Sequence, residues 1–420
     1  MTRRAWFLCV LTVVLNAALA LAQMQEKVLY TFGSYPGDGA GPVGSMVMDH
    51  AGNLYGVTMS GGLDSCPLYY ACGIVYEISP NNDGTWSERI LYSFCQEVNC
   101  SDGGTPMGGL IIDDKGNLYG TTSASGGVGG GTVFELSPSS LKGGTWTYTV
   151  LHAFCSLDNC ADGASPRGTI VFDAAGNLYG TTASGSGRGT VFELSPGNGG
   201  WTETVLYIFC PNGGFPCPDG AFPQAGVTLD KFGNIYGTTL QGGGNEQEGG
   251  TIFKLTPGAN GWTETVLLAF SEHYKGYLIG PSGGVSLDPA GNLLTTFYFG
   301  LKDQGGIVMQ KPDGAIEHHI MFYGVNDAPT FGLFFDNQHR VAYGSSFGGT
   351  FGPGNVFEVD KSGRVTVVYA FCQQQGCTDG SQPSGVLIKD RSGNMYGAAE
   401  SGGYSEQYGY GVGVVYELTP

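Results

Sequence analysis

Residues 173–196 read DAAGNLYGTTASGSGRGTVFELSP, and this stretch decides the fold. An aspartate followed by the Gly-Asn pair at 176–177, between two apolar runs, is strong hairpin chemistry, because asparagine and glycine tolerate a positive φ in a tight turn. The Leu-Tyr-Gly segment at 178–180 therefore predicts one strand. The Val-Phe-Glu-Leu segment at 191–194 alternates with period two and predicts the next strand.

The same turn signature recurs along the chain. An Asp-x-x-Gly-Asn-(Leu/Ile/Met)-Tyr-Gly pattern occurs at Asp49–Gly56, Asp113–Gly120, Asp173–Gly180, Asp230–Gly237 and Asp390–Gly397. A variant that opens at Asp288 keeps the Gly-Asn pair but has Leu294 in place of the tyrosine. A degenerate copy begins at Asp336, where His339 and Arg340 replace the Gly-Asn pair. The chain therefore holds seven repeats.

Two further elements accompany each turn. A Gly-x-Val-aromatic-Glu-Leu-Ser-Pro pattern occurs at Gly73–Pro80, Gly131–Pro138, Gly189–Pro196, Gly250–Pro257 and Gly413–Pro420, with weaker versions at Gly306–Pro312 and Gly354–Asp360. An alternating run follows at Trp86–Phe94, Trp146–Phe154, Trp201–Phe209 and Trp262–Phe270, with equivalents at Ile316–Phe322 and Val365–Phe371. With the short apolar segment before each turn, every repeat predicts four strands.

The period and the strand count predict the architecture. Residues 23–420 give about 57 residues per repeat, a period typical of propellers and solenoids. Four strands per repeat predict an all-β, seven-bladed β-propeller that forms one domain over 23–420. The chain starts with an isolated fourth strand at 27–32 and ends with an isolated third strand at 414–419. We expect these to pair, so that the N-terminal strand completes the last blade and closes the ring. A linear solenoid would instead need polar caps.

Three linked motifs recur in order over the repeats: Gly-Asn-Leu-Tyr-Gly-Thr-Thr, Gly-Thr-Val-Phe-Glu-Leu-Ser-Pro and Phe-Cys-x4-Cys-x-Asp-Gly. This combination resembles the GloVer tandem-repeat proteins, which are exported bacterial proteins. The resemblance covers essentially all of residues 23–420. It implies a propeller-like repeat fold and export, and it implies no catalytic residues.

Residues 1–22 predict a signal peptide. Arg3 and Arg4 precede an apolar stretch at 6–15, and Ala-Leu-Ala at 20–22 is a small-x-small cleavage site. The start also loosely resembles a twin-arginine signal, although we favour the general secretory route. We therefore expect a secreted or periplasmic protein.

The remaining ten cysteines form five couples that are close in sequence: Cys66/Cys72, Cys95/Cys100, Cys155/Cys160, Cys210/Cys217 and Cys372/Cys377. An even count in an exported chain is typical of disulfides, and proximity favours a bridge within each couple. Zinc is the alternative. Zinc sites favour gaps of about two to four residues and ligands from two knuckles, so four intervening residues are within reach. However, export and the near absence of histidine neighbours favour disulfides.

Composition excludes several function classes. The 420 residues include 74 glycines, 36 acidic and 18 basic residues, with a net charge of -18. Nucleic acid and anionic membranes require basic patches, so we expect neither as a partner. No apolar run after residue 22 is long enough to span a bilayer. We expect a packed core, because 41% of the residues are hydrophobic. We also expect a monomer.

Two columns of aspartates recur with the repeats. We expect the turn aspartates to accept backbone N–H bonds across the hairpin. The second column precedes glycine in the loop from a fourth strand to the next blade, at Asp38, Asp102, Asp162, Asp219 and Asp379. Turn stabilisation is the simpler interpretation of this column. Calcium, bound by Asp102, Asp162, Asp219 and Asp379, is the alternative, because carboxylate and carbonyl oxygens converge there. We expect no other cofactor.

Enzyme motifs are scarce. Residues 280–284 read GPSGG, but a nucleophile elbow needs a strand-to-helix turn, and no helix is predicted. The six histidines form no metal-ligand pattern. Each inner strand has a glycine four or five residues before its turn aspartate, at Gly44, Gly109, Gly168, Gly226, Gly284, Gly332 and Gly385. Glycine has no side chain, so this column provides few ligands for a metal ion at the centre of the ring.

Tyrosines in two loops predict a binding patch. The loop between the second and third strands holds Tyr69 and Tyr70 in blade 1, and Tyr404, Tyr408 and Tyr410 in blade 7. These blades are neighbours in a closed ring, so the rings are predicted to cluster and bind sugar or peptide; ordinary loop packing is the alternative. The prediction is an exported, non-enzymatic binding or scaffold propeller for extracellular carbohydrate or protein. The alternative is a propeller lyase or lactonase-type hydrolase acting on a polysaccharide or lactone.

Overall fold

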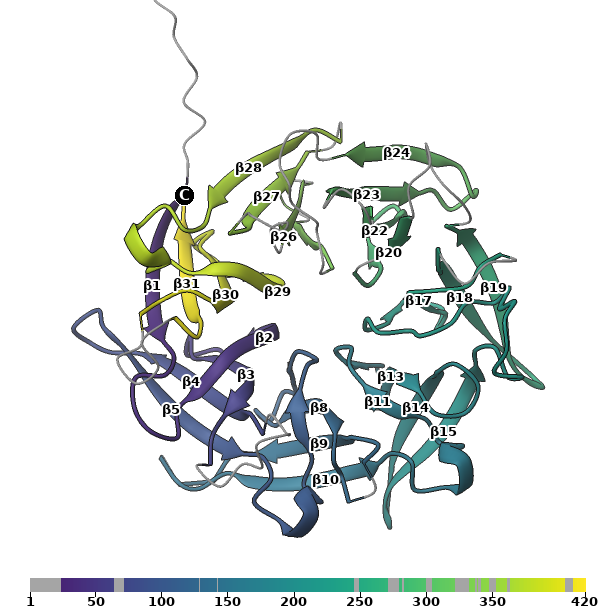
Figure 1. Ribbon diagram of the computed structural model, residues 1–420, viewed down its shortest axis with the longest axis horizontal. Coiled ribbons are helices and arrows are strands. Elements are labelled where there is room, and N and C mark those ends of the chain that lie inside the picture. Colours follow the sequence, from purple (N-terminus) through teal and green to yellow (C-terminus); the bar gives the residue numbers. More distant parts are fainter. Residues whose placement is uncertain are drawn as a thin grey trace, which may run out of the picture.

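Each repeat forms one antiparallel sheet, and seven sheets stand side by side around a central axis (Figure 1). In each sheet the first strand lies next to the axis and the fourth strand lies outside. The predicted all-β, seven-bladed propeller of four-stranded blades is confirmed. The computed structural model describes residues 24–63, 72–127, 129–141, 143–244, 249–270, 279–281, 283–299, 304–321, 332–336, 338, 341–346, 353–360, 363–404 and 411–420.

The strands of a blade follow one another in chain order from the axis outward, except that β1 completes blade 7. Blade 1 contains β2 (Gly39–Met48), β3 (Leu54–Gly61), β4 (Ile74–Pro80) and β5 (Trp86–Ser93). Blade 2 contains β6 (Gly104–Pro106) and β7 (Ile111–Ile112), β8 (Leu118–Ala124), β9 (Thr132–Ser137) and β10 (Thr147–Ala153). Blade 3 contains β11 (Ala164–Pro166) and β12 (Val171–Phe172), β13 (Leu178–Ser184), β14 (Thr190–Gly197) and β15 (Gly200–Ile208).

Blade 4 contains β16 (Thr228–Leu229), β17 (Ile235–Thr239), β18 (Thr251–Gly258) and β19 (Gly261–Ala269). Blade 5 contains β20 (Ile279–Pro281) and β21 (Ser286–Leu287), β22 (Leu293–Phe299), β23 (Gln304–Gln310) and β24 (Ile316–Met321). Blade 6 contains β25 (Phe334–Asp336), β26 (Val341–Ser346), β27 (Asn355–Val359) and β28 (Val365–Ala370). Blade 7 contains β29 (Ser381–Lys389), β30 (Met395–Ser401), β31 (Val414–Thr419) and β1 (Gln25–Thr31).

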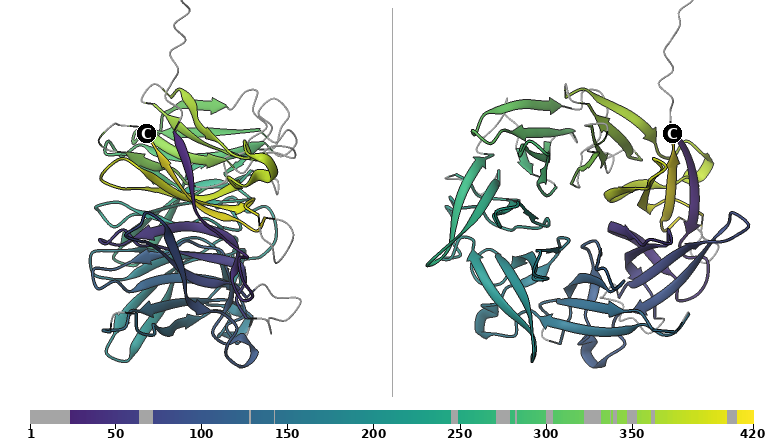
Figure 2. Two further views of the ribbon diagram at one scale, coloured as in Figure 1. Left: turned by 90° about the vertical axis from the view of Figure 1, so that its left-hand side faces the viewer. Right: turned by 180° about the vertical axis from the view of Figure 1, so that it is seen from behind.

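The two ends of the described chain close the ring. β1 pairs with β31 from Gln25 opposite Thr419 to Thr31 opposite Val414. The purple N-terminal strand accordingly lies beside the yellow C-terminal strand in the same blade (Figures 1 and 2). Ring closure by the N-terminal strand is thereby confirmed, and the pairing covers the outer edge of β31.

The aspartate of each first hairpin organises its turn. Asp173 Oδ1 accepts hydrogen bonds from the backbone N–H groups of Ala175 and Asn177, at 2.8 and 2.9 Å. Its Oδ2 accepts from Asn177 Nδ2 at 2.8 Å and from the Tyr179 hydroxyl at 3.2 Å. Asp49, Asp113, Asp230 and Asp390 bind the equivalent groups. The expected structural role of this column is confirmed.

Aromatic residues join neighbouring blades. Phe94 follows the outer strand of blade 1, is fully buried, and packs edge-on against Phe134 of blade 2 at 5.3 Å between ring centroids. The same pairing recurs around the ring, in Phe32–Tyr76, Phe154–Phe192, Phe209–Phe253 and Phe371–Tyr416. Burying such a ring contributes about 1.5–3 kcal/mol to folding. The second-strand tyrosines also pack between blades, as expected: Tyr119 lies 5.1 Å from Phe172 of the next blade.

Four of the predicted couples are disulfides, namely Cys95–Cys100, Cys155–Cys160, Cys210–Cys217 and Cys372–Cys377. Cys72 is also disulfide-bonded, and Cys66 lies outside the described residues. Each of the four closes a loop that leads from one blade into the next. Within the described part of the chain, no helix has the length and hydropathy needed to cross a membrane.

Candidate functional site: an axial pocket

The innermost strands are interrupted where they meet the axis. In blade 2, β6 ends at Pro106 and β7 begins at Ile111, and both pair with β8. Blades 3 and 5 repeat this break, and in blade 1 the register of β2 shifts between Val43 and Val47. The sequence predicted the first strand only after the glycines, whereas the pairing also begins before them. Four residues separate the two pieces in blade 2: Met107, Gly108 and Gly109 line the axis, whereas Leu110 is buried in the core.

The glycine column lets the blades touch through their main chains. A Cβ atom on Gly44 would lie 2.6 Å from the Gly109 nitrogen of blade 2, and one on Gly385 would overlap the Gly44 carbonyl oxygen. A Cβ on Gly168 would likewise overlap the Gly226 nitrogen of blade 4. Such distances are shorter than real Cβ atoms show. Glycine is therefore required at these positions for close approach of neighbouring backbones.

Side-chain hydroxyl groups form hydrogen bonds between neighbouring blades close to the axial glycines. The second-strand threonines Thr181 and Thr238 donate to the carbonyl oxygens of Ala225 and Gly283 on the next blade, at 2.9 and 3.0 Å. Between the last blade and the first, Ser384 Oγ donates to the Pro42 carbonyl oxygen at 2.9 Å. The axial main chain is therefore held by direct hydrogen bonds from blade to blade.

A pocket of about 410 Å³ lies inside this ring of glycines. All seven blades contribute to its wall. Ligand sites of proteins usually enclose about 300–1,000 Å³ and combine apolar walls with a few polar groups. The apolar side chains here are Met107, Val171, Val227, Val285 and Val386. The polar side chains are Ser45, Arg167, Thr169, Gln224, Thr228 and Ser286.

Arg167 is the only charged residue among the described residues that line the pocket. Its Nε is buried and has no hydrogen-bond partner. The sequence-predicted sites did not include Arg167. The available signal was its place in the Pro-x-Gly column, where the other repeats carry uncharged residues: Val43, Met107, Gln224, Ser282, Thr330 and Ser384. An arginine at the axis provides a planar, permanently charged donor.

Three further side chains offer donors to the pocket. Ser45 Oγ accepts from the Val386 backbone N–H at 3.0 Å, and Thr169 Oγ1 accepts from the Gly109 N–H at 2.8 Å. Each hydroxyl thus keeps its own proton for another acceptor. Gln224 lines the pocket in blade 4 at the position equivalent to Arg167. The pocket is therefore rich in hydrogen-bond donors and is suited to an acceptor-rich ligand.

The predicted tyrosine patch falls largely outside the described residues. Of its five members only Tyr404 is described, and it is 62% exposed. Tyr69, Tyr70, Tyr408 and Tyr410 lie outside the described part of the chain. Ser282 of the GPSGG motif also lies outside it, while Gly283 and Gly284 line the axial pocket.

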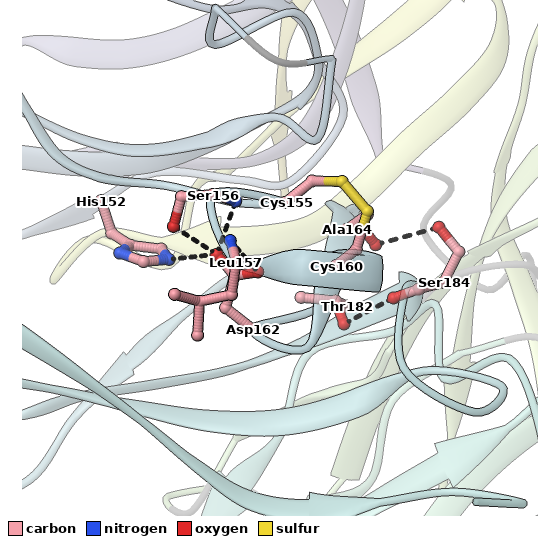
Figure 3. Close-up of a disulfide and its surroundings, with 9 residues drawn as sticks. All are labelled: His152, Cys155, Ser156, Leu157, Cys160, Asp162, Ala164, Thr182 and Ser184. Carbon is pink, nitrogen blue, oxygen red and sulfur yellow. Dashed lines mark hydrogen bonds and ion pairs between the residues drawn. A yellow bond between two sulfur atoms is a disulfide. The ribbon is translucent and has the colours of Figure 1, made fainter.

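The second aspartate column lies in the loops between blades. Asp162 is fully buried beside the Cys155–Cys160 disulfide (Figure 3). Its Oδ2 accepts from the Ser156 N–H at 3.0 Å and from Ser156 Oγ at 2.8 Å, and lies 3.3 Å from His152 Nε2. Burial alone would raise the pKa of Asp162, but the hydrogen bonds from Ser156 and from backbone N–H groups hold it below its ordinary value.

The other four aspartates of this column bind equivalent groups. A tyrosine hydroxyl of the preceding outer strand donates to each at 2.8–3.1 Å, in the pairs Tyr30–Asp38, Tyr92–Asp102, Tyr207–Asp219 and Tyr369–Asp379. Backbone N–H groups of the loop occupy further lone pairs. The proposed calcium ligands Asp102, Asp162, Asp219 and Asp379 therefore sit in four separate loops, each with its own donors. Among the described residues, no three His, Cys, Asp or Glu side chains gather as metal ligands.

A column of glutamates on the outer strands has raised pKa values, in contrast to the lowered pKa of Asp162. Glu26, Glu88, Glu203 and Glu264 each bury one carboxylate oxygen without a hydrogen bond. Burial is the main cause that raises the pKa of each to about 7. The charge of an aspartate in the loop that enters the same blade adds to it: Asp162 for Glu203 and Asp219 for Glu264. These glutamates take up protons near neutral pH.

The comparisons with known proteins agree with this architecture. The propeller is similar to a fungal alcohol oxidase of the AA5 family solved in complex with copper, with 12% identity and a TM-score of 0.54 over 95% of this chain and 77% of that chain. At that identity the likeness shows the fold alone. Among curated proteins, none matches. The family model described as the Gloeobacter/Verrucomicrobia repeat matches residues 17–159 and 68–280. These matches span more than half of the chain, so the protein belongs to the Gloeobacter/Verrucomicrobia repeat family.

Proposed function

We propose that this protein is an exported, non-enzymatic binding propeller that holds a small ligand in its axial pocket. The observation that carries the proposal is the pocket of about 410 Å³, where an arginine without a partner at Nε and several free donors face a common space. One fold can carry many functions, so the function of a propeller has to be inferred from a site of this kind and not from the fold. The four described disulfides and the signal peptide predicted at 1–22 support an extracytoplasmic location.

A variant that fills the pocket tests this proposal. Gln224→Trp adds bulk at a position where the repeats carry side chains that range in size from serine to arginine, so we expect the blade to fold. Leu141→Trp is the matched control, because Leu141 is 74% exposed and does not line the pocket. In a calorimetric screen of glycans and small metabolites, we expect Gln224→Trp to weaken binding at least about tenfold and the control to bind like the wild type.

The tyrosine patch provides the second arm of the same screen. Tyr404 is 62% exposed, which supports the loops between the second and third strands, here called the rim, as a site for carbohydrate or protein. Binding lost in Tyr404→Ala but kept in Gln224→Trp would move the site from the axis to the rim. Turnover of a lactone or polysaccharide that a chelator abolishes and calcium restores would instead favour the hydrolase or lyase alternative.

A further inference from the structure

The axial pocket carries a positive charge that no part of the described protein neutralises. Arg167 makes no hydrogen bond or ion pair with any described residue, although the chain has 36 acidic residues. A buried donor without an acceptor costs about 1–3 kcal/mol. A guanidinium that lines the axial pocket and whose Nε is buried without a partner is suited to an anion that enters from outside.

The geometry of the donor favours a carboxylate. Guanidinium presents parallel N–H groups in a plane and matches a carboxylate through two hydrogen bonds. The protein has a net charge of -18, and Arg167 is the only cation among the described residues of the pocket. One positive charge balances a monoanion, whereas a phosphate dianion would keep an uncompensated charge in this negative field.

The rest of the wall favours a hydroxylated ligand. The hydroxyls of Ser45 and Thr169 keep protons to donate, and the Gln224 amide both donates and accepts. Valines and Met107 supply apolar surface against which C–H groups of a sugar ring pack. A pocket of about 410 Å³ is at the small end of ligand sites.

We propose that the axial pocket recognises a small hydroxylated monocarboxylate of the uronic-acid type, with Arg167 binding the carboxylate and Ser45, Thr169 and Gln224 binding hydroxyls. This inference rests on the proposed function, because it assigns the ligand class of the same pocket. Arg167 acts as the specificity-determining residue. The neutral residues in the same column of the other repeats indicate that the fold does not require its charge.

Titration calorimetry on the purified protein tests the assignment with three probes: glucuronate, glucose and inorganic phosphate. We expect glucuronate to bind best and Arg167→Gln to lose about ten- to a hundredfold in affinity, the range for hydrogen bonds to a charged group. Arg167→Gln copies the residue that blade 4 carries at 224 and removes a donor without an acceptor, so we expect it to fold and to melt no lower than the wild type. Arg167→Lys keeps the charge without the fork, so we expect intermediate affinity.

The outcomes separate this inference from the proposed function. If glucose binds as well as glucuronate, or phosphate binds better, and Gln224→Trp abolishes that binding, the axial site stands and the carboxylate assignment is wrong. Equal glucuronate affinity in Arg167→Gln and wild type also overturns the assignment. If no probe and no member of the wider screen binds in a manner sensitive to Gln224→Trp, both proposals fail.

Discussion

Two pairs of carboxylates in this propeller have pKa values that are shifted in opposite directions. Asp162 and Asp173 accept several hydrogen bonds each, which outweigh the effect of burial and hold their pKa values below the ordinary one. Glu203 and Glu264 are desolvated and face a second negative charge, and their pKa values rise to about 7. For these four residues, the difference follows from whether the ionised oxygens find donors.

The raised glutamates make stability depend on pH. The folded protein holds protons on Glu203 and Glu264 up to about pH 7, whereas the unfolded chain releases them near 4.5. Their contribution is complete below about 4.5 and is lost as pH rises through about 7. We expect the melting temperature of the double variant Glu203→Gln, Glu264→Gln to fall less than that of the wild type between about pH 5 and about pH 8.

The control is Glu97→Gln, because Glu97 is an exposed glutamate in the loop that enters blade 2. Its pH profile should parallel that of the wild type. Thermal unfolding followed by circular dichroism measures all three proteins. Parallel profiles for the double variant and the wild type would contradict the prediction.

At the scale of elements, the first hairpin of each blade depends on one carboxylate. In blade 3, Asp173 accepts four hydrogen bonds from Ala175, Asn177 and Tyr179. Blade 6 lacks the Gly-Asn pair, and there Asp336 Oδ1 accepts from the Gln338 backbone N–H at 2.9 Å while its Oδ2 accepts from Lys389 of blade 7 at 2.6 Å. The aspartate of this turn therefore binds a local backbone N–H and also ties the turn to the neighbouring blade.

Removing the turn carboxylate should destabilise one blade measurably. Asp173→Ala leaves the backbone N–H groups of Ala175 and Asn177 without their acceptor, so we expect a loss of about 1–3 kcal/mol in the free energy of unfolding. Asp173→Asn keeps one acceptor oxygen and should lie between that variant and the wild type. Urea unfolding measures the difference.

Asp158→Ala provides the comparison, because Asp158 is exposed in the disulfide loop that leads into the same blade. Surface substitutions of this kind usually change stability by less than about 0.5 kcal/mol. An Asp173→Ala midpoint as close to the wild type as that of Asp158→Ala would show that the turn does not need its carboxylate.

At the scale of the whole molecule, the ring closes at two places. On the outside β1 completes the sheet of blade 7 through β31. At the axis Gly385 of blade 7 meets Gly44 of blade 1, both with positive φ, of 75° and 68°. The axial contact is the one with no room for a side chain.

A methyl group at the axial contact between blades 7 and 1 should destabilise the closed ring. Gly385→Ala combines an unfavourable positive φ with overlap of the Gly44 carbonyl oxygen, so we expect a loss of at least about 2 kcal/mol in stability. Gly199→Ala is the matched control, because a Cβ there meets nothing within 4 Å. Differential scanning calorimetry compares the two. If Gly385→Ala melts with Gly199→Ala, the axial backbone contact does not hold the ring.

Most of the fold was predictable because short sequence motifs specify each turn and strand, and these motifs recur in every repeat. The Asp173 turn and the period-two strand around Phe192 each specify their own hydrogen bonds. Ring closure was predictable from the unpaired strands at 27–32 and 414–419. The candidate site was not. The tyrosine loops drew attention because aromatic residues are visible in sequence, whereas Arg167 is one residue in one of seven similar Pro-x-Gly segments.

The sequence by itself determined the blades, their number and the strand that joins the ends, since neighbouring residues suffice for hairpins and strands. The tertiary structure alone decided what meets at the axis, because those contacts join residues dozens of positions apart, or hundreds in the case of Gly385 and Gly44. The axial segments of the seven blades come together only when the ring is closed. That convergence brings glycine backbones into contact and places Arg167, Gln224, Ser45 and Thr169 around one pocket.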